Sequence, residues 1–205
     1  MDDLDKSIRN IESRTGVRNG FFSDLLKEDD WSFIIKSHAL LESACAEILT
    51  EHSGVPEMIN IYSRLELSAK TTGKIAFLKA FDLTIDRERR FITSLSELRN
   101  LLVHNVRNTT FNLFDHVAGL DKNQKKIFIE SFGYAYLEND EQGKEFISQP
   151  QRVIDMPKES IWLSLKYVLG IISVQINSIR LEREIEMRRT ELVKNLLPEG
   201  VSSFV

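Results

Sequence analysis

The sequence predicts an all-α protein that folds as a single helical bundle with a long C-terminal helix. Its 205 residues include only nine glycines and four prolines, so few positions interrupt a helix. Hydrophobic residues make up 42% and charged residues 28%, a balance typical of a globular domain long enough to bury a substantial core. Apolar residues recur at steps of three and four along most of the chain, as they do on the buried face of a helix.

The first elements are separated by glycines. Residues 1–30 are expected to form an N-terminal lead-in with one or two short helices around a break at Gly16 and Gly20. A strongly amphipathic helix is predicted over 31–51.

Three shorter helical segments are predicted next. Pro56 suits the start of a helix over 57–65, and apolar spacing predicts another over 72–81. Asp86 is the expected N-cap of a helix that reaches residue 105 or 108. Its core-facing stripe is expected to contain Phe91, Leu95, Leu98 and Leu102.

The second half is predicted to alternate irregular and helical segments. Asp121 is expected to cap a helix that ends near Phe132. Residues 137–157 read as a polar excursion with room for a hairpin, and a helix is predicted from 158 to about 196. The part from 180 onward is dense in charges, so we expect 180–205 to extend beyond the bundle or to line a dimer. The whole chain, 1–205, is predicted to be one domain.

The predicted helix from Asp86 carries the residues best suited to chemistry, namely Arg99, Asn100 and His104. Histidine titrates near neutral pH, and arginine presents a charged planar fork that suits phosphate. Together they suit metal-independent cleavage of RNA. The histidine takes a proton from a 2′-hydroxyl or gives one to the leaving oxygen, the arginine stabilises charge on the phosphoryl oxygens, and Asn100 orients the phosphate or the imidazole.

Helical geometry determines which of these residues can act together within one chain. At about 100° per residue, His104 shares a face with Glu97 and Asn100, whereas Arg99 lies about 140° away. Arg99 and His104 therefore cooperate most readily if two copies of the helix meet in a homodimer. Without such a dimer, the same residues form an ordinary polar surface stripe, since this spacing is common in helical proteins.

Neighbouring polar residues extend the candidate site. Arg90, Glu97, Asn105 and Arg107 are predicted to bind RNA. Clusters of basic residues at 87–90 and 125–126 could hold phosphates, although a solvated surface is the simpler interpretation.

The other histidines and the cysteine are interpreted as structural. His38 and His116 have no partners with metal-ligand spacing, and His52 sits at the end of a predicted helix. Cys45 lies on an apolar helix face. With no glycine-rich phosphate loop either, we predict neither a metal nor a cofactor.

Composition indicates a cytoplasmic protein that does not enter a membrane. A single cysteine suits a reducing compartment, and the acidic start lacks the apolar core of a signal peptide. The most apolar stretch, 168–174, is too short to cross a bilayer. A net charge of −4 argues against a strongly basic nucleic-acid scaffold.

The segment 99–104, Arg-Asn-Leu-Leu-Val-His, resembles the Arg-x4–6-His motif of the HEPN superfamily of small α-helical domains. The order of the helices is similar as well. Within that group, residues 32–105 look most like the mannitol operon repressor family, whose Leu-Arg-x-x-Leu-x-His helix corresponds to 98–104. This resemblance covers about a third of the chain.

The resemblance implies two kinds of function. Many HEPN proteins are metal-independent endoribonucleases, often toxins paired with an antitoxin or effectors of phage defence, whose active site forms between two protomers. By that analogy Arg99 and His104 would be catalytic, and Asn100 would assist them. Relatives of the mannitol repressor are instead non-catalytic regulators that act through protein contacts, for example with a transcription factor. A third reading is a module that binds RNA or nucleotides without cleaving them.

Overall fold

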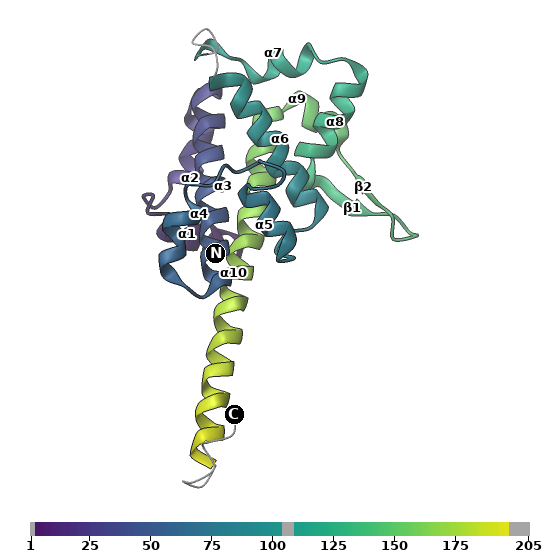
Figure 1. Ribbon diagram of the computed structural model, residues 1–205. Helices are drawn as coiled ribbons and strands as arrows, with labels where there is room; N and C mark the ends of the chain where they lie inside the picture. The colour runs from purple at the N-terminus through teal and green to yellow at the C-terminus, as the bar shows by residue number, and fades with distance from the viewer. Residues whose placement is uncertain (1–2, 104–108, 197–205) are drawn as a thin grey trace.

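The computed structural model, which describes residues 3–103 and 109–196, is an all-α bundle with one long C-terminal helix, as the sequence predicts (Figure 1). Its four longest helices are α1 (Asp3–Thr15), α3 (Asp30–Ser53), α6 (Asp86–Val103) and α10 (Pro157–Leu196). Helices α3, α6 and α10 run alongside one another through the body of the molecule, and α7, α8 and α9 gather at one end.

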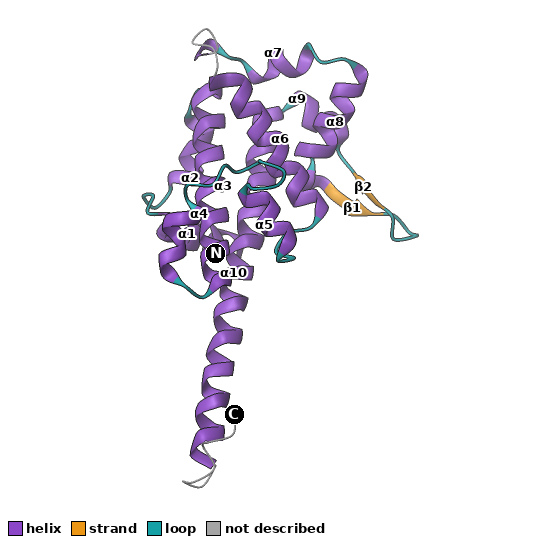
Figure 2. Cartoon of the chain, in the orientation of Figure 1, coloured by secondary structure: helices purple, strands orange, loops and turns teal. Residues whose placement is uncertain are grey.

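The remaining elements are short and connect or cover the long helices (Figure 2). The two strands form an antiparallel hairpin in which Leu137 lies opposite Ile147, inside the segment that the sequence marks as a polar excursion. The short elements are α2 (Phe21–Asp24), η1 (Leu25–Lys27), η2 (Pro56–Met58), α4 (Ile59–Tyr62), α5 (Lys74–Ala80), α7 (Leu113–Ala118), α8 (Lys122–Phe132), η4 (Tyr134–Tyr136), β1 (Leu137–Asn139), β2 (Glu145–Ile147) and α9 (Pro150–Asp155).

Local signals set the ends of the predicted helices. The Asp29 side chain caps α3 by accepting from the backbone N–H of Ser32, and Gly54 ends it in the left-handed conformation with φ 72°. Asp121 caps α8, as predicted. The helix expected over 57–65 is instead a short 3-10 turn followed by the single turn of α4.

The core is built mainly on α3 and the first half of α10. Phe33, Leu41 and Leu165 are completely buried there, and each such side chain contributes about 1.5–3 kcal/mol of burial energy. Helix α1 packs against both α3 and α10 through Ile8 and Ile11. The expected N-terminal lead-in therefore supplies part of the bundle core.

The second half of α10 projects away from the bundle (Figure 1). Leu181, Ile185 and Leu192 are 58%, 56% and 62% exposed on it. By length and composition alone, α10 holds an 18-residue window apolar enough to cross a membrane, longer than the apolar run noted in the sequence. However, 56% of that window is buried inside the structure, as in a core helix.

Candidate functional site

Helix α6 fixes Arg99 and Asn100 by burying an apolar stripe, which has Arg99 at its edge and Asn100 on the opposite face of the helix. The predicted core stripe is confirmed, because its members are at most 7% exposed: Phe91, Leu95, Leu98 and Leu102. The helix packs against α3 on one side and α8 on the other. Its polar residues are therefore divided between two surfaces.

Arg99 is half-buried and belongs to the α3 side. Its Nη1 donates to Oδ1 of Asn100 at 3.0 Å, so the two neighbouring residues hold each other in place. The Arg99 guanidinium also lies near enough to His38 on α3 for its positive charge to influence that imidazole.

His38, Glu42 and Lys74 form a polar cluster beside Arg99. Glu42 lies one turn after His38 on α3, and its Oε2 is 3.9 Å from His38 Nδ1. Its Oε1 is 3.0 Å from the ammonium of Lys74, a side chain with no exposed surface. Burial lowers the pKa of His38. Glu42 opposes that shift, while the charges of Arg99 and Lys74 reinforce it. At neutral pH the imidazole is thus uncharged.

The charges of this cluster leave an excess of one positive unit. Lys74 and Glu42 neutralise each other, His38 is neutral, and Arg99 adds one charge. Within the described ranges no carboxylate lies within 4.0 Å of the Arg99 guanidinium. Arg99 is therefore available to pair with an anion, and a guanidinium pairs especially well with phosphate.

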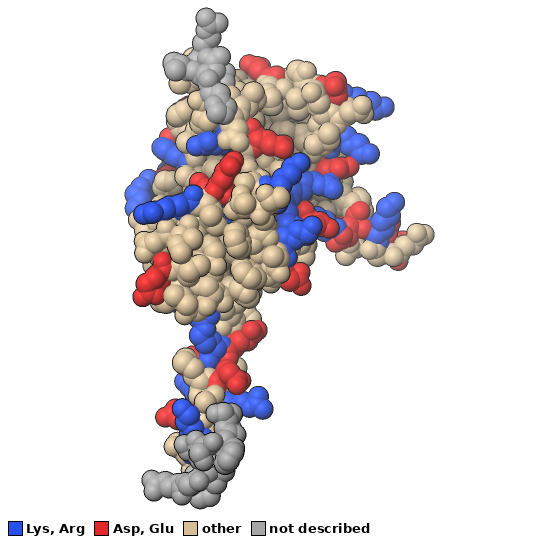
Figure 3. Space-filling model, in the orientation of Figure 1, with Lys and Arg blue, Asp and Glu red and all other residues tan. Residues whose placement is uncertain are grey.

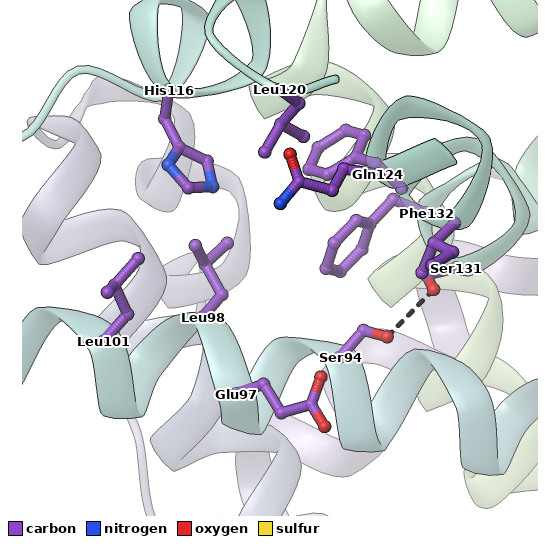
Figure 4. Close-up of a pocket in the computed structure, with 11 residues that line it drawn as sticks. Ser94, Glu97, Leu98, Leu101, His116, Leu120, Gln124, Ser131 and Phe132 are labelled. Carbon is purple, nitrogen blue, oxygen red and sulfur yellow. Dashed lines mark hydrogen bonds between the residues drawn. The ribbon is translucent and has the colours of Figure 1, made fainter. Parts of the chain in front are cut away.

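Arg90 and Glu97, two of the predicted RNA-binding residues, lie on the α8 side of α6. Arg90 pairs with Glu130 of α8 at 2.8 Å, and both side chains are about half exposed. Glu97 is exposed and lines a pocket between α6, α7 and α8 (Figure 4). The structure thus places Glu97 and Arg99 on different sides of α6.

This pocket has a volume of about 260 Å³. Leu98, Phe128 and Phe132 give it an apolar floor. His116 and Gln124 point into it from α7 and α8 (Figure 4). Burial lowers the pKa of His116, which keeps its imidazole neutral at neutral pH.

Three residues of the predicted site, His104, Asn105 and Arg107, lie outside the described residues. His38 was predicted to be a structural histidine without partners. In the structure it lies close to the Glu42 carboxylate and to the Arg99 guanidinium. The four-residue step from His38 to Glu42 is a signal that could have found the pair. No sequence signal marks Lys74 as buried, because its burial depends on the loop after α4.

Other chemistry finds little support in the described part of the chain. No group of three His, Cys, Asp or Glu side chains there could hold a metal ion. Complete burial raises the pKa of Cys45 to about 12, so its thiol stays protonated and is a poor nucleophile. On the face in Figure 3, acidic and basic side chains of the described residues are interspersed without a continuous basic band.

No family model, curated protein or solved structure matches this chain.

Proposed function

We propose that the chain is a HEPN-like, metal-independent endoribonuclease of the toxin or phage-defence type that acts as a cytoplasmic homodimer. The observation that carries the proposal is the uncompensated charge of Arg99. Because Lys74 occupies the Glu42 carboxylate, the guanidinium is free to bind a phosphate, and Asn100 restricts its orientation.

The proposed reaction is transfer of a phosphoryl group within the RNA. His104 of one protomer takes the proton of a 2′-hydroxyl, and that oxygen attacks the adjacent phosphorus. The bond from phosphorus to the 5′-oxygen breaks, and the protonated His104 of the second copy donates a proton to the leaving oxygen. The products are a 2′,3′-cyclic phosphate and a 5′-hydroxyl. Arg99 stabilises the negative charge that builds on the non-bridging oxygens.

The proposed active site needs two copies of the chain, and the projecting part of α10 supports their association (Figure 1). Leu181, Ile185 and Leu192 repeat at steps of four and seven, the spacing of a coiled-coil seam. An exposed apolar seam on a projecting helix suits a second copy of the same helix.

The decisive experiment is cleavage of RNA by the purified protein in EDTA, with analysis of the product ends. His104→Ala is expected to slow cleavage by roughly 10²–10⁴-fold, and Arg99→Lys should also impair it, since an ammonium does not reproduce the guanidinium fork. The matched controls are His52→Ala and Arg64→Lys, at two exposed positions. Cleavage by the folded His104→Ala variant at the rate of the unmodified protein would refute the assignment.

A second candidate function is a non-catalytic regulator similar to the mannitol operon repressor, which would bind a transcription factor or another protein. The same exposed seam of α10 favours it, because exposed apolar patches mark protein contacts. A protein that forms a stable complex with a regulator but leaves every RNA intact would support this function instead.

A further inference from the structure

The pocket between α6, α7 and α8 has the size of a small ligand. Its volume of about 260 Å³ is just below the range of about 300–1,000 Å³ for sites that hold drug-sized molecules. Phe128 and Phe132 lie in its apolar floor, with ring centroids 4.7 Å apart, and are only 6% and 3% exposed. A single nucleobase, which has apolar faces and a polar edge, suits a site with an apolar floor and polar groups at its sides.

Gln124 offers the pocket a donor with a defined orientation. Its Oε1 accepts from the backbone N–H of Asp121 at 2.9 Å, as part of the capping box of α8. This bond directs the amide nitrogen of Gln124 into the pocket (Figure 4). A ligand therefore meets an NH₂ group on the α8 side.

Glu97 offers acceptors on the α6 side. Its carboxylate is exposed at the pocket, and among the described residues no basic group lies within 4.0 Å of it. A carboxylate with two free oxygens can accept two parallel hydrogen bonds from one ligand. His116 is neutral, so it does not neutralise the Glu97 charge.

We propose that this pocket binds a guanine base of the RNA substrate, an inference that rests on the proposed ribonuclease function. Guanine carries two adjacent donors, N1–H and N2–H, that match the Glu97 carboxylate, and beside them an acceptor, O6, that matches the Gln124 amide. Adenine offers the Glu97 carboxylate one donor, N6–H, in place of two, so it makes one hydrogen bond fewer with the same two side chains. The base packs on the apolar floor, to which Leu98 and Phe132 belong.

The position of the pocket links base recognition to cleavage. Glu97 lies two residues before Arg99 on α6, and an α-helix is about 10–12 Å across with its side chains. Nucleotides a few positions apart can span that distance. Guanine is therefore expected at one fixed position within a few nucleotides of the cut.

The first test maps cleavage sites in a randomised RNA pool in EDTA. Gln124→Glu is the sharpest variant, because it keeps the oxygen that caps α8 but replaces the donor for O6 with an acceptor. This variant and Glu97→Gln should each reduce the preference for guanine over the other bases, measured among the cleaved sites, about tenfold or more. The matched controls in the exposed hairpin turn, Gln142→Glu and Glu141→Gln, should leave the preference unchanged. A wild-type protein without guanine preference, or variants that retain it, would overturn the proposal.

A second test separates this inference from the proposed function. Binding of the dinucleotides GpA and ApA to His104→Ala protein is measured by NMR titration, so cleavage plays no part. We expect GpA to bind at least about tenfold more tightly than ApA and Gln124→Glu to abolish the difference. If this holds but the unmodified protein cleaves no RNA, the guanine site stands and the ribonuclease function fails. Equal binding of the two dinucleotides overturns the guanine site, whatever the outcome of the cleavage assay.

Discussion

The buried ammonium of Lys74 lies 3.0 Å from the carboxylate of Glu42, on a different helix. The same ammonium also donates to the backbone carbonyl oxygens of Ser63 and Leu65. One side chain thus ties the loop after α4 to α3 and neutralises Glu42, the carboxylate of the cluster beside Arg99. The cluster therefore stabilises the fold and also determines the net charge of the candidate site.

Lys74→Met is expected to lower the free energy of unfolding by about 2–4 kcal/mol, since the partly buried Glu42 carboxylate and two carbonyl groups lose their donor. Urea denaturation followed by circular dichroism measures the loss. The exposed Lys70→Met is the control and should change little.

A double-mutant cycle tests whether the loss comes from the ion pair itself. Adding Glu42→Met to Lys74→Met removes both charges, so the two substitutions should couple by about 1 kcal/mol or more. Strictly additive losses would mean that Lys74 stabilises the protein in some other way.

The lowered pKa of His38 predicts a stability that depends on pH. A histidine whose pKa falls on folding is protonated first in the unfolded chain. The free energy of unfolding therefore decreases as the pH falls below the ordinary histidine pKa of about 6.5 and stops decreasing below the folded pKa. Denaturation at pH 7.5 and 5.5 should show a smaller pH effect in His38→Gln than in the unmodified protein.

Since burial lowers the pKa of His116 as well, His116→Gln should produce a similar, independent reduction. His52→Gln, at an exposed position, serves as the control. If His38→Gln and the unmodified protein lose the same stability between the two pH values, His38 does not titrate as the structure implies.

The sequence predicted best those features that local rules control. Asp121 caps α8 as expected because capping depends on a few adjacent residues. The buried stripe of α6 follows from helical periodicity, which also separates Arg99 from Glu97.

Features created by packing between distant segments were not predictable. The Lys74 site depends on carbonyl groups of a loop that has no helical pattern. The pocket exists because α7 and α8 pack onto the α6 face that carries Glu97, and periodicity within one helix does not reveal its neighbours. The proximity of Arg99 to His38 depends on the packing of α6 against α3 and was hidden for the same reason, whereas Glu42 follows His38 by one helical turn.

The capping box of α8 is expected to contribute measurably to stability. Asp121→Ala removes the acceptor for the Gln124 N–H, which lies 2.8 Å away, and should cost about 1 kcal/mol. For a chain of this size, that loss corresponds to a decrease in melting temperature of about 2–4 °C. Calorimetry would detect it. Asp115→Ala, at an exposed position on α7, should lower the melting temperature less. Equal decreases for the two variants would show that the capping box adds no stability beyond that of an ordinary exposed aspartate.

The exposed seam of α10 makes the dimer testable separately from the chemistry. Replacing Ile185 and Leu192 together by glutamate puts charges into a contact that needs apolar surface, so the dimer dissociation constant should rise by about a hundredfold or more. Sedimentation equilibrium measures it. Met187→Glu adds one such charge at a similarly exposed position on another face of α10 and should leave association unchanged. If the proposed active site forms between two protomers, the double variant should also lose RNA cleavage at concentrations where it is monomeric and regain it at higher concentration. A monomeric double variant that cleaves as fast as the unmodified protein would show that Arg99 and His104 of one chain suffice, and a double variant that remains dimeric would place the contact elsewhere.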